Sequence, residues 1–174
     1  MALEDLTDGS LTDFGLDTNF RDAAYSWEPK RTHQFIMEIG GIPGYLIKTA
    51  AKPTLENGEI TLNHINVERY MKGRSKWSAM SITLYDPIVP NGARAVMEWV
   101  RLHHESVTGR NGYATTYKKQ ISLKQLSPLG EVIEDWTLHG AFITSANFGG
   151  TLDWSGEDAA TIELGLRFDY AFLN

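Results

Sequence analysis

Few residues in this chain have the type and spacing that chemistry requires, and the densest titratable group is His103-His104-Glu105. On a helix, consecutive side chains point about 100° apart, so adjacent histidines cannot hold one metal ion as an i, i+4 pair does. We therefore expect these histidines to lie at a helix C-terminus, where a partly protonated imidazole interacts favourably with the helix dipole.

Three carboxylates, Glu131, Glu134 and Asp135, could in principle supply an acid-base pair. Glu134 and Asp135 are adjacent in a predicted strand, so their side chains face opposite sides of the sheet. We interpret all three as solvated strand and turn residues.

A pocket lined by His64, His139 and Glu134 would make the chain a small β-barrel enzyme or binding module, and this is the alternative from a different class. His33, His64 and His139 lie on separate predicted strands, and nothing in the sequence requires them to converge.

The sequence contains no cysteine, which excludes disulfides, thiolate nucleophiles and thiolate metal sites. Neither a Gly-x-Ser-x-Gly motif, a P-loop nor a dinucleotide fingerprint is present. We expect no catalysis and no cofactor.

The length and composition favour one globular domain. The chain has 174 residues, 42% of them hydrophobic, and no run approaches the roughly 18 apolar residues of a membrane-spanning helix. The sequence starts Met1-Ala2-Leu3-Glu4-Asp5, without the charged and apolar regions of a secretory signal, so we expect a product made in the cytoplasm and no contact with a membrane.

The negative charge is concentrated in residues 1–30, which hold seven acidic residues against Arg21 and Lys30. We expect this segment to be an acidic arm that orders on a neighbouring subunit, and a disordered leader is the alternative. The overall charge of −6 argues against tight binding of nucleic acid. The large apolar residues expected to make inter-subunit contacts are Phe14, Phe20, Tyr25 and Trp27.

The elements that must position these residues are mostly strands in the body, residues 31–174. The strongest signal is residues 161–170, where polar and apolar residues alternate strictly. Asn57-Gly58 predicts a hairpin turn, and Asn91 predicts the cap of one substantial helix that ends near Gly109. The predicted strands are 33–39, 45–51, 60–68, 77–85, 120–126, 131–141 and 161–170.

These elements predict a mostly β fold, an antiparallel barrel or sandwich of about seven strands with one flanking helix. Between the third and fourth strands we expect a basic turn containing Arg69, Lys72, Arg74 and Lys76. It is either a solvated turn that prevents wrong edge pairing or a contact with an acidic partner, such as the arm of a neighbouring copy in a head-to-tail assembly.

Several ordered motifs together resemble one family. The motifs are Phe35 to Ile39 followed by Lys48-Thr49-Ala50-Ala51-Lys52-Pro53, the strand into Trp77, the helix with Trp99, residues 136–142, Gly149-Gly150-Thr151-Leu152-Asp153-Trp154, and the terminal strand. In order and spacing they resemble the tube proteins of contractile bacteriophage tails, whose fold is shared by type VI secretion and tailocin tube subunits.

The resemblance implies a structural subunit of the virion tail, forming hexameric rings that stack into a tube for DNA ejection. It further implies a lumen built from two hairpins per subunit, which we assign to residues 45–68 and 120–141. The implied partners are further copies of the chain, the tail sheath, baseplate and tail-terminator proteins, and a tape measure protein in the lumen. DNA would pass without tight binding. The expected lumen-facing residues are Thr61, Asn63, Glu131 and Glu134.

Two alternatives within this class stay open at this point. One is a tube initiator at the baseplate, because an arm of about 30 residues fits the family less clearly than the body does. The other is the tube subunit of a phage-like injection particle.

Overall fold

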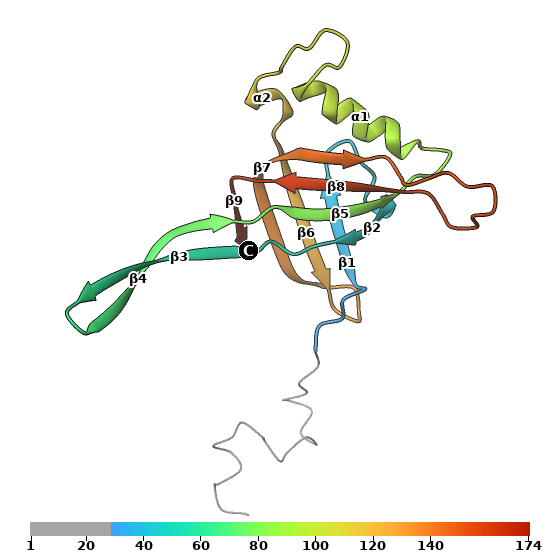
Figure 1. Ribbon diagram of the computed structural model, residues 1–174. Coiled ribbons are helices and arrows are strands. Elements are labelled where there is room, and N and C mark those ends of the chain that lie inside the picture. Colours follow the sequence, from blue (N-terminus) through green and yellow to red (C-terminus); the bar gives the residue numbers. More distant parts are fainter. Residues whose placement is uncertain (1–28) are drawn as a thin grey trace, which may run out of the picture. The chain divides into compact units, whose positions relative to one another are not determined.

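The computed structural model describes residues 29–174, of which Thr32–Asn174 form one compact unit (Figure 1). Within these residues, seven strands make one antiparallel sheet and two more make a separate ribbon, which confirms the mostly β, antiparallel fold. The order in the sheet is β1 (Phe35–Ile39), β6 (Lys119–Leu126), β7 (Val132–Asn147), β8 (Thr161–Arg167), β5 (Met80–Tyr85) and β2 (Ile47–Ala50), with β9 (Tyr170–Leu173) paired to β7. The ribbon consists of β3 (Leu55–His64) and β4 (Val67–Trp77).

Strand β7 joins the two halves of this sheet. Its residues 132–141 pair with β6, whereas residues 142–147 pair with β8. At the change of partner, Gly140 has a φ of 66°, and the backbone N–H of Asp169 donates to the carbonyl of His139 at 2.9 Å. The Lys118 ammonium lies 2.7 Å from the Asp169 carboxylate. The bend in β7 and the bend between β8 and β9 therefore form one corner.

One hydrophobic core lies between the two halves. Ile162, Leu164 and Leu166 of β8 are buried, as the alternation of the terminal strand predicts. The strand is nevertheless divided, because Asp169 occupies the corner and the chain continues as β9. The opposing layer contributes Met37, Ile39, Ile121, Leu123 and Leu138.

The helix α1 (Gly92–His103) covers this core, while α2 (Ala114–Tyr117) and the 3₁₀ turn Gly44–Leu46 are short. The predicted cap is confirmed, since the Asn91 side chain accepts a hydrogen bond from the Arg94 N–H at 2.7 Å. Trp99 is buried and donates to the Tyr117 carbonyl at 2.8 Å. The helix ends before the predicted Gly109. Among the described residues, neither helix combines the length and apolar character needed to span a bilayer.

The predicted hairpin turn at Asn57-Gly58 was wrong. Asn57-Gly58 lies inside β3, and the hairpin turn is at Ile65 and Asn66, so β3 pairs with β4 and residues 45–50 do not form a hairpin with it. β2 pairs with β5 instead. The two strands approach closely here, because a Cβ on Gly58 would lie 3.3 Å from the Arg74 carbonyl oxygen and one on Gly73 only 3.0 Å from the Gly58 carbonyl carbon.

The hairpin predicted over residues 120–141 is confirmed as the β6–β7 pair. Its turn falls at residues 127–131, where the Ser127 N–H donates to the Glu131 carbonyl at 2.7 Å.

Replacing Gly140 with Ala should lower the free energy of unfolding by about 2–4 kcal/mol, because the left-handed backbone is strained and the new Cβ would collide with Asp169. Gly130→Ala is the matched control, since φ is 88° there but a Cβ meets no atom within 4 Å. Urea unfolding should give a loss of about 1–2 kcal/mol for the control. Equal losses would show that the corner does not depend on space at Gly140.

Candidate assembly surface

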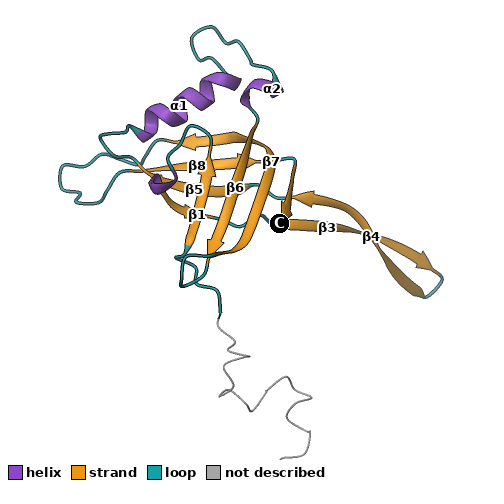
Figure 2. Cartoon of the chain, turned by 180° about the vertical axis from the view of Figure 1, so that it is seen from behind, coloured by secondary structure: helices purple, strands orange, loops and turns teal. Residues whose placement is uncertain are grey.

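The β3–β4 ribbon projects from the body of the protein (Figures 1 and 2). Every residue of β3 is exposed, and in β4 only Gly73 and Trp77 are partly covered. A two-stranded hairpin without a packing surface is at best marginally stable in water. The ribbon therefore lacks, within the described chain, the cover that would stabilise it.

The outer half of the ribbon has two different faces. Directly paired residues share a face, and Ile60 pairs with Met71, Leu62 with Arg69 and His64 with Val67. We call the face formed by these six residues the apolar face. Four of its side chains are apolar and are 46–58% exposed: Ile60, Leu62, Val67 and Met71. The alternate positions form the polar face, which consists of Glu59, Thr61, Asn63, Glu68, Tyr70 and Lys72.

The basic residues predicted for a turn lie along a strand. Arg69, Lys72, Arg74 and Lys76 all belong to β4, so the predicted turn was wrong. Arg69 shares the apolar face and Lys72 the polar face, because alternate strand residues point to opposite sides. Within residues 29–174, no ion pair involves any of these four side chains. Their role in an inter-subunit contact stays a prediction.

The residues predicted to face a lumen have separate environments. Thr61 and Asn63 are exposed on the polar face of the ribbon, and Glu131 is exposed in the β6–β7 turn. Glu134 is only 8% exposed, and its carboxylate accepts hydrogen bonds from Trp136 Nε1 and, at 2.8 Å, from Lys52 Nζ. Its burial in this internal ion pair counts against a lumen-facing role for Glu134.

The pocket proposed for an enzyme is not formed. His64 lies near the end of the projecting ribbon, whereas His139 of β7 stacks on Tyr170 and Phe172, with ring centroids 4.9 and 5.3 Å away. Glu134 is held by Lys52. The part of the chain that the structure describes also has no group of three side chains suited to a metal ion.

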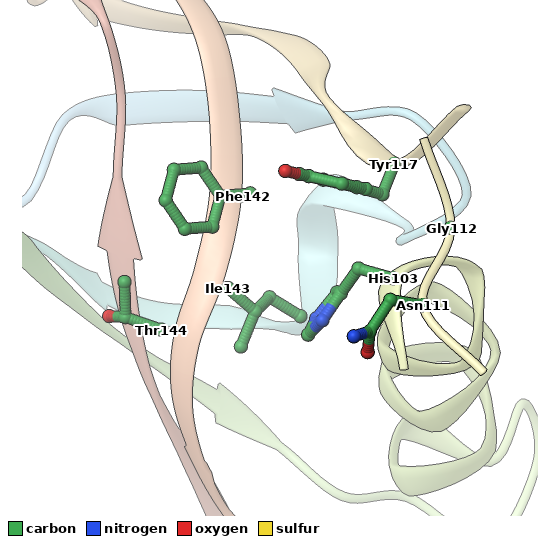
Figure 3. A pocket seen from close by; sticks show the side chains of 7 residues that line it. All are labelled: His103, Asn111, Gly112, Tyr117, Phe142, Ile143 and Thr144. Atoms are coloured by element: carbon green, nitrogen blue, oxygen red, sulfur yellow. The ribbon is translucent and has the colours of Figure 1, made fainter. Parts of the chain in front are cut away.

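A different pocket, of about 510 Å³, lies between the end of α1, the loop that follows it and β7 (Figure 3). His103 lines it, with its ring 5.6 Å from that of Tyr117 and its Nε2 buried without a hydrogen-bond partner. Neither a carboxylate nor a cysteine lines the pocket, so nothing there would orient His103 as a general base. No pattern in the sequence predicts this pocket, because Phe142 is distant along the chain from Asn111 and Tyr117 and only the folded chain brings them together.

The expected charge of His103 was wrong. Burial, and secondarily the nearby His104, hold the pKa of His103 below its usual value, which disfavours a protonated imidazole at the helix end. His104 is directed elsewhere, with Nδ1 3.2 Å from Asn111 Oδ1.

A pH-dependent stability follows from His103. The pKa of His103 is lower in the folded than in the unfolded chain, so the unfolded chain binds more protons. The contribution of neutral His103 to the free energy of unfolding is therefore lost as the pH falls below about 6.5. His103→Gln should lack this contribution. The difference in free energy of unfolding between wild type and the variant, measured by urea titration, should therefore become smaller as the pH falls from 7 to 5. His64→Gln, on the exposed ribbon, is the control; parallel profiles for wild type and His103→Gln would refute the assignment.

No protein-family model matches the sequence, and no curated protein matches it. The fold is similar to three solved cryo-EM structures of contractile injection particles. The PVC sheath/tube terminator of an extracellular contractile injection system in its extended state superposes with a TM-score of 0.68 at 18% identity, covering 86% of this chain and 99% of that one. The tube-terminating cap of the anti-feeding prophage gives 0.68 at 22% identity, covering 91% and 99%.

The third structure, the PVC sheath-tube complex in its extended state, gives a TM-score of 0.62 at 17% identity, covering 95% of this chain and 98% of that one. This chain thus has the fold of tube and terminator components of contractile injection particles. The resemblance drawn from the sequence motifs is confirmed at the level of the fold.

Proposed function

We propose that this chain is a structural, non-catalytic subunit of the tail tube of a contractile particle, and that copies of it form hexameric rings stacked around a conduit. The observation that carries the proposal is the β3–β4 ribbon, whose apolar face residues 29–174 leave uncovered. The likeness to tube and terminator components, which extends over nearly their full length, supports it.

The two faces of the ribbon suit a tube wall. The apolar face would pack on a neighbouring copy, and the polar face, with Thr61 and Asn63, would border the conduit. The polar face carries Glu59 and Glu68 against Lys72, so it would not hold a passing polyanion such as DNA. Strands β1 and β2 each end the sheet with one edge unpaired in the described residues, and pairing between copies would cover such edges.

The further partners proposed are a sheath, a baseplate, a terminator and a tape measure protein, with DNA as the cargo of a phage tail. Similar chains come from sheath-tube, terminator and baseplate assemblies, which supports the first three. The aromatic contacts predicted for the arm, Phe14, Phe20, Tyr25 and Trp27, lie outside the described residues and stay predictions.

A second candidate is a ring at one end of the tube, either a terminator or the initiator at the baseplate. It is favoured by the TM-scores of 0.68 for the terminator and the cap, against 0.62 for the sheath-tube complex. An end ring would form single or paired rings, whereas a tube subunit would elongate without limit.

Size-exclusion chromatography and negative-stain microscopy of the full chain test the proposal over a range of protein and salt concentrations. Stacked rings are expected, because the described residues leave the ribbon uncovered and a neighbouring copy would cover it. Single rings would favour the end-ring candidate. A protein that remains monomeric under all these conditions would overturn both.

Leu62→Asp should weaken ring formation and leave the melting temperature of the monomer unchanged, because Leu62 is exposed and is not part of the core of the described residues. The concentration needed for assembly should rise about tenfold or more. Asn63→Asp is the matched control, since it adds the same charge one residue away on the polar face. The ribbon would lose its proposed role if the two variants assembled equally.

A further inference from the structure

The loop between β7 and β8 carries an uncovered apolar pair within an acidic segment. In residues 148–160, Leu152 and Trp154 are almost fully exposed. The same residues include Asp153, Glu157 and Asp158 and no Lys or Arg. We call residues 148–160 the acidic loop. An exposed Trp beside an exposed Leu is typical of a protein interface, where Trp is enriched among the residues that dominate binding.

The acidic loop and the ribbon lie at opposite sides of the body in both overall views (Figures 1 and 2). A chain therefore cannot bring its own loop onto its own ribbon. In a head-to-tail assembly of identical copies, the loop of one copy and the ribbon of the next can meet at every contact.

The charges of the two surfaces are complementary and have no ionic partner within the described chain. Asp153 accepts a hydrogen bond from the Ser155 N–H at 3.0 Å, which holds its pKa below the usual value and keeps it ionised at neutral pH. No ion pair in residues 29–174 involves Asp153, Glu157 or Asp158. The same holds for Arg69, which is placed among the aliphatic residues of the apolar face.

We propose that the acidic loop of one copy docks on the apolar face of the β3–β4 ribbon of the next copy. Leu152 and Trp154 cover Ile60, Leu62 and Met71, and Asp153 pairs with Arg69. The contact joins apolar surface to apolar surface and carboxylate to guanidinium, so it gives both affinity and orientation. It rests on the proposed function, because only an assembly of copies supplies both halves.

The absence of cysteine makes a direct test possible. Full-length Leu152→Cys and Leu62→Cys chains are mixed, assembled and mildly oxidised, and the disulfide-linked dimer is measured on a non-reducing gel. The dimer should be at least about tenfold more abundant than in the control mixture of Leu129→Cys with Leu62→Cys, because Leu129 is equally exposed but lies in the β6–β7 turn. If Leu62→Cys blocks assembly, Met71→Cys on the same face replaces it.

Charge reversal gives an independent readout. Asp153→Arg and Arg69→Asp should each raise the concentration needed for assembly, and the chain carrying both changes should recover toward wild type. Mixing the two single variants should likewise restore assembly, with the two chains alternating, since each loop then meets a ribbon of opposite charge.

The failures of the two proposals are distinguishable. If the wild-type chain does not assemble, the tube function and this contact fall together. If it assembles but the crosslink is no stronger than the control, only the loop-to-ribbon contact is overturned. Loss of binding to a sheath subunit by Trp154→Ala, with assembly unchanged, would assign the loop to that partner and overturn the contact between copies.

Discussion

The corner where β7 changes partners determines the rest of this structure. Gly140 allows the backbone to turn, the His139 carbonyl receives the Asp169 N–H, and Lys118 holds the Asp169 carboxylate. Both the bend of β7 and the passage from β8 to β9 depend on this one set of contacts. The two halves of the sheet can then enclose a single core that α1 covers. Because the body is complete in this way, the ribbon and the acidic loop are left outside it.

Much of the body follows from local sequence patterns. The alternation around Leu164 identifies the buried face of β8, and Asn91 identifies the start of the helix, since both signals act within a few residues. Asn57-Gly58 was misleading because Gly also serves where two backbones approach closely. The Gly140 corner was not predictable, since its partner Asp169 is distant in sequence and only the folded chain brings them together.

The candidate assembly surface was predicted only in part. The placement of Thr61 and Asn63 on one polar face agrees with the period-two pattern of that strand. Glu134 looked equally solvent-facing in the sequence, but Lys52 and Trp136 approach it from elsewhere in the fold and bury it. The pKa of His103 was likewise set by tertiary burial and not by the helix dipole. Periodicity shows which side chains share a face, but not which other part of the chain covers that face.

The exposure of the ribbon separates two properties that a compact protein usually couples. The core residues decide whether this chain folds, whereas Ile60, Leu62 and Met71 add nothing to that core. In the proposed assembly, these positions decide which chains are accepted as neighbours. Substitutions on the ribbon can then change which subunits co-assemble when two kinds of particle are made in one cell, while the stability of the monomer changes little. Lineages of such tubes can become mutually exclusive while their monomers remain nearly identical in structure and stability.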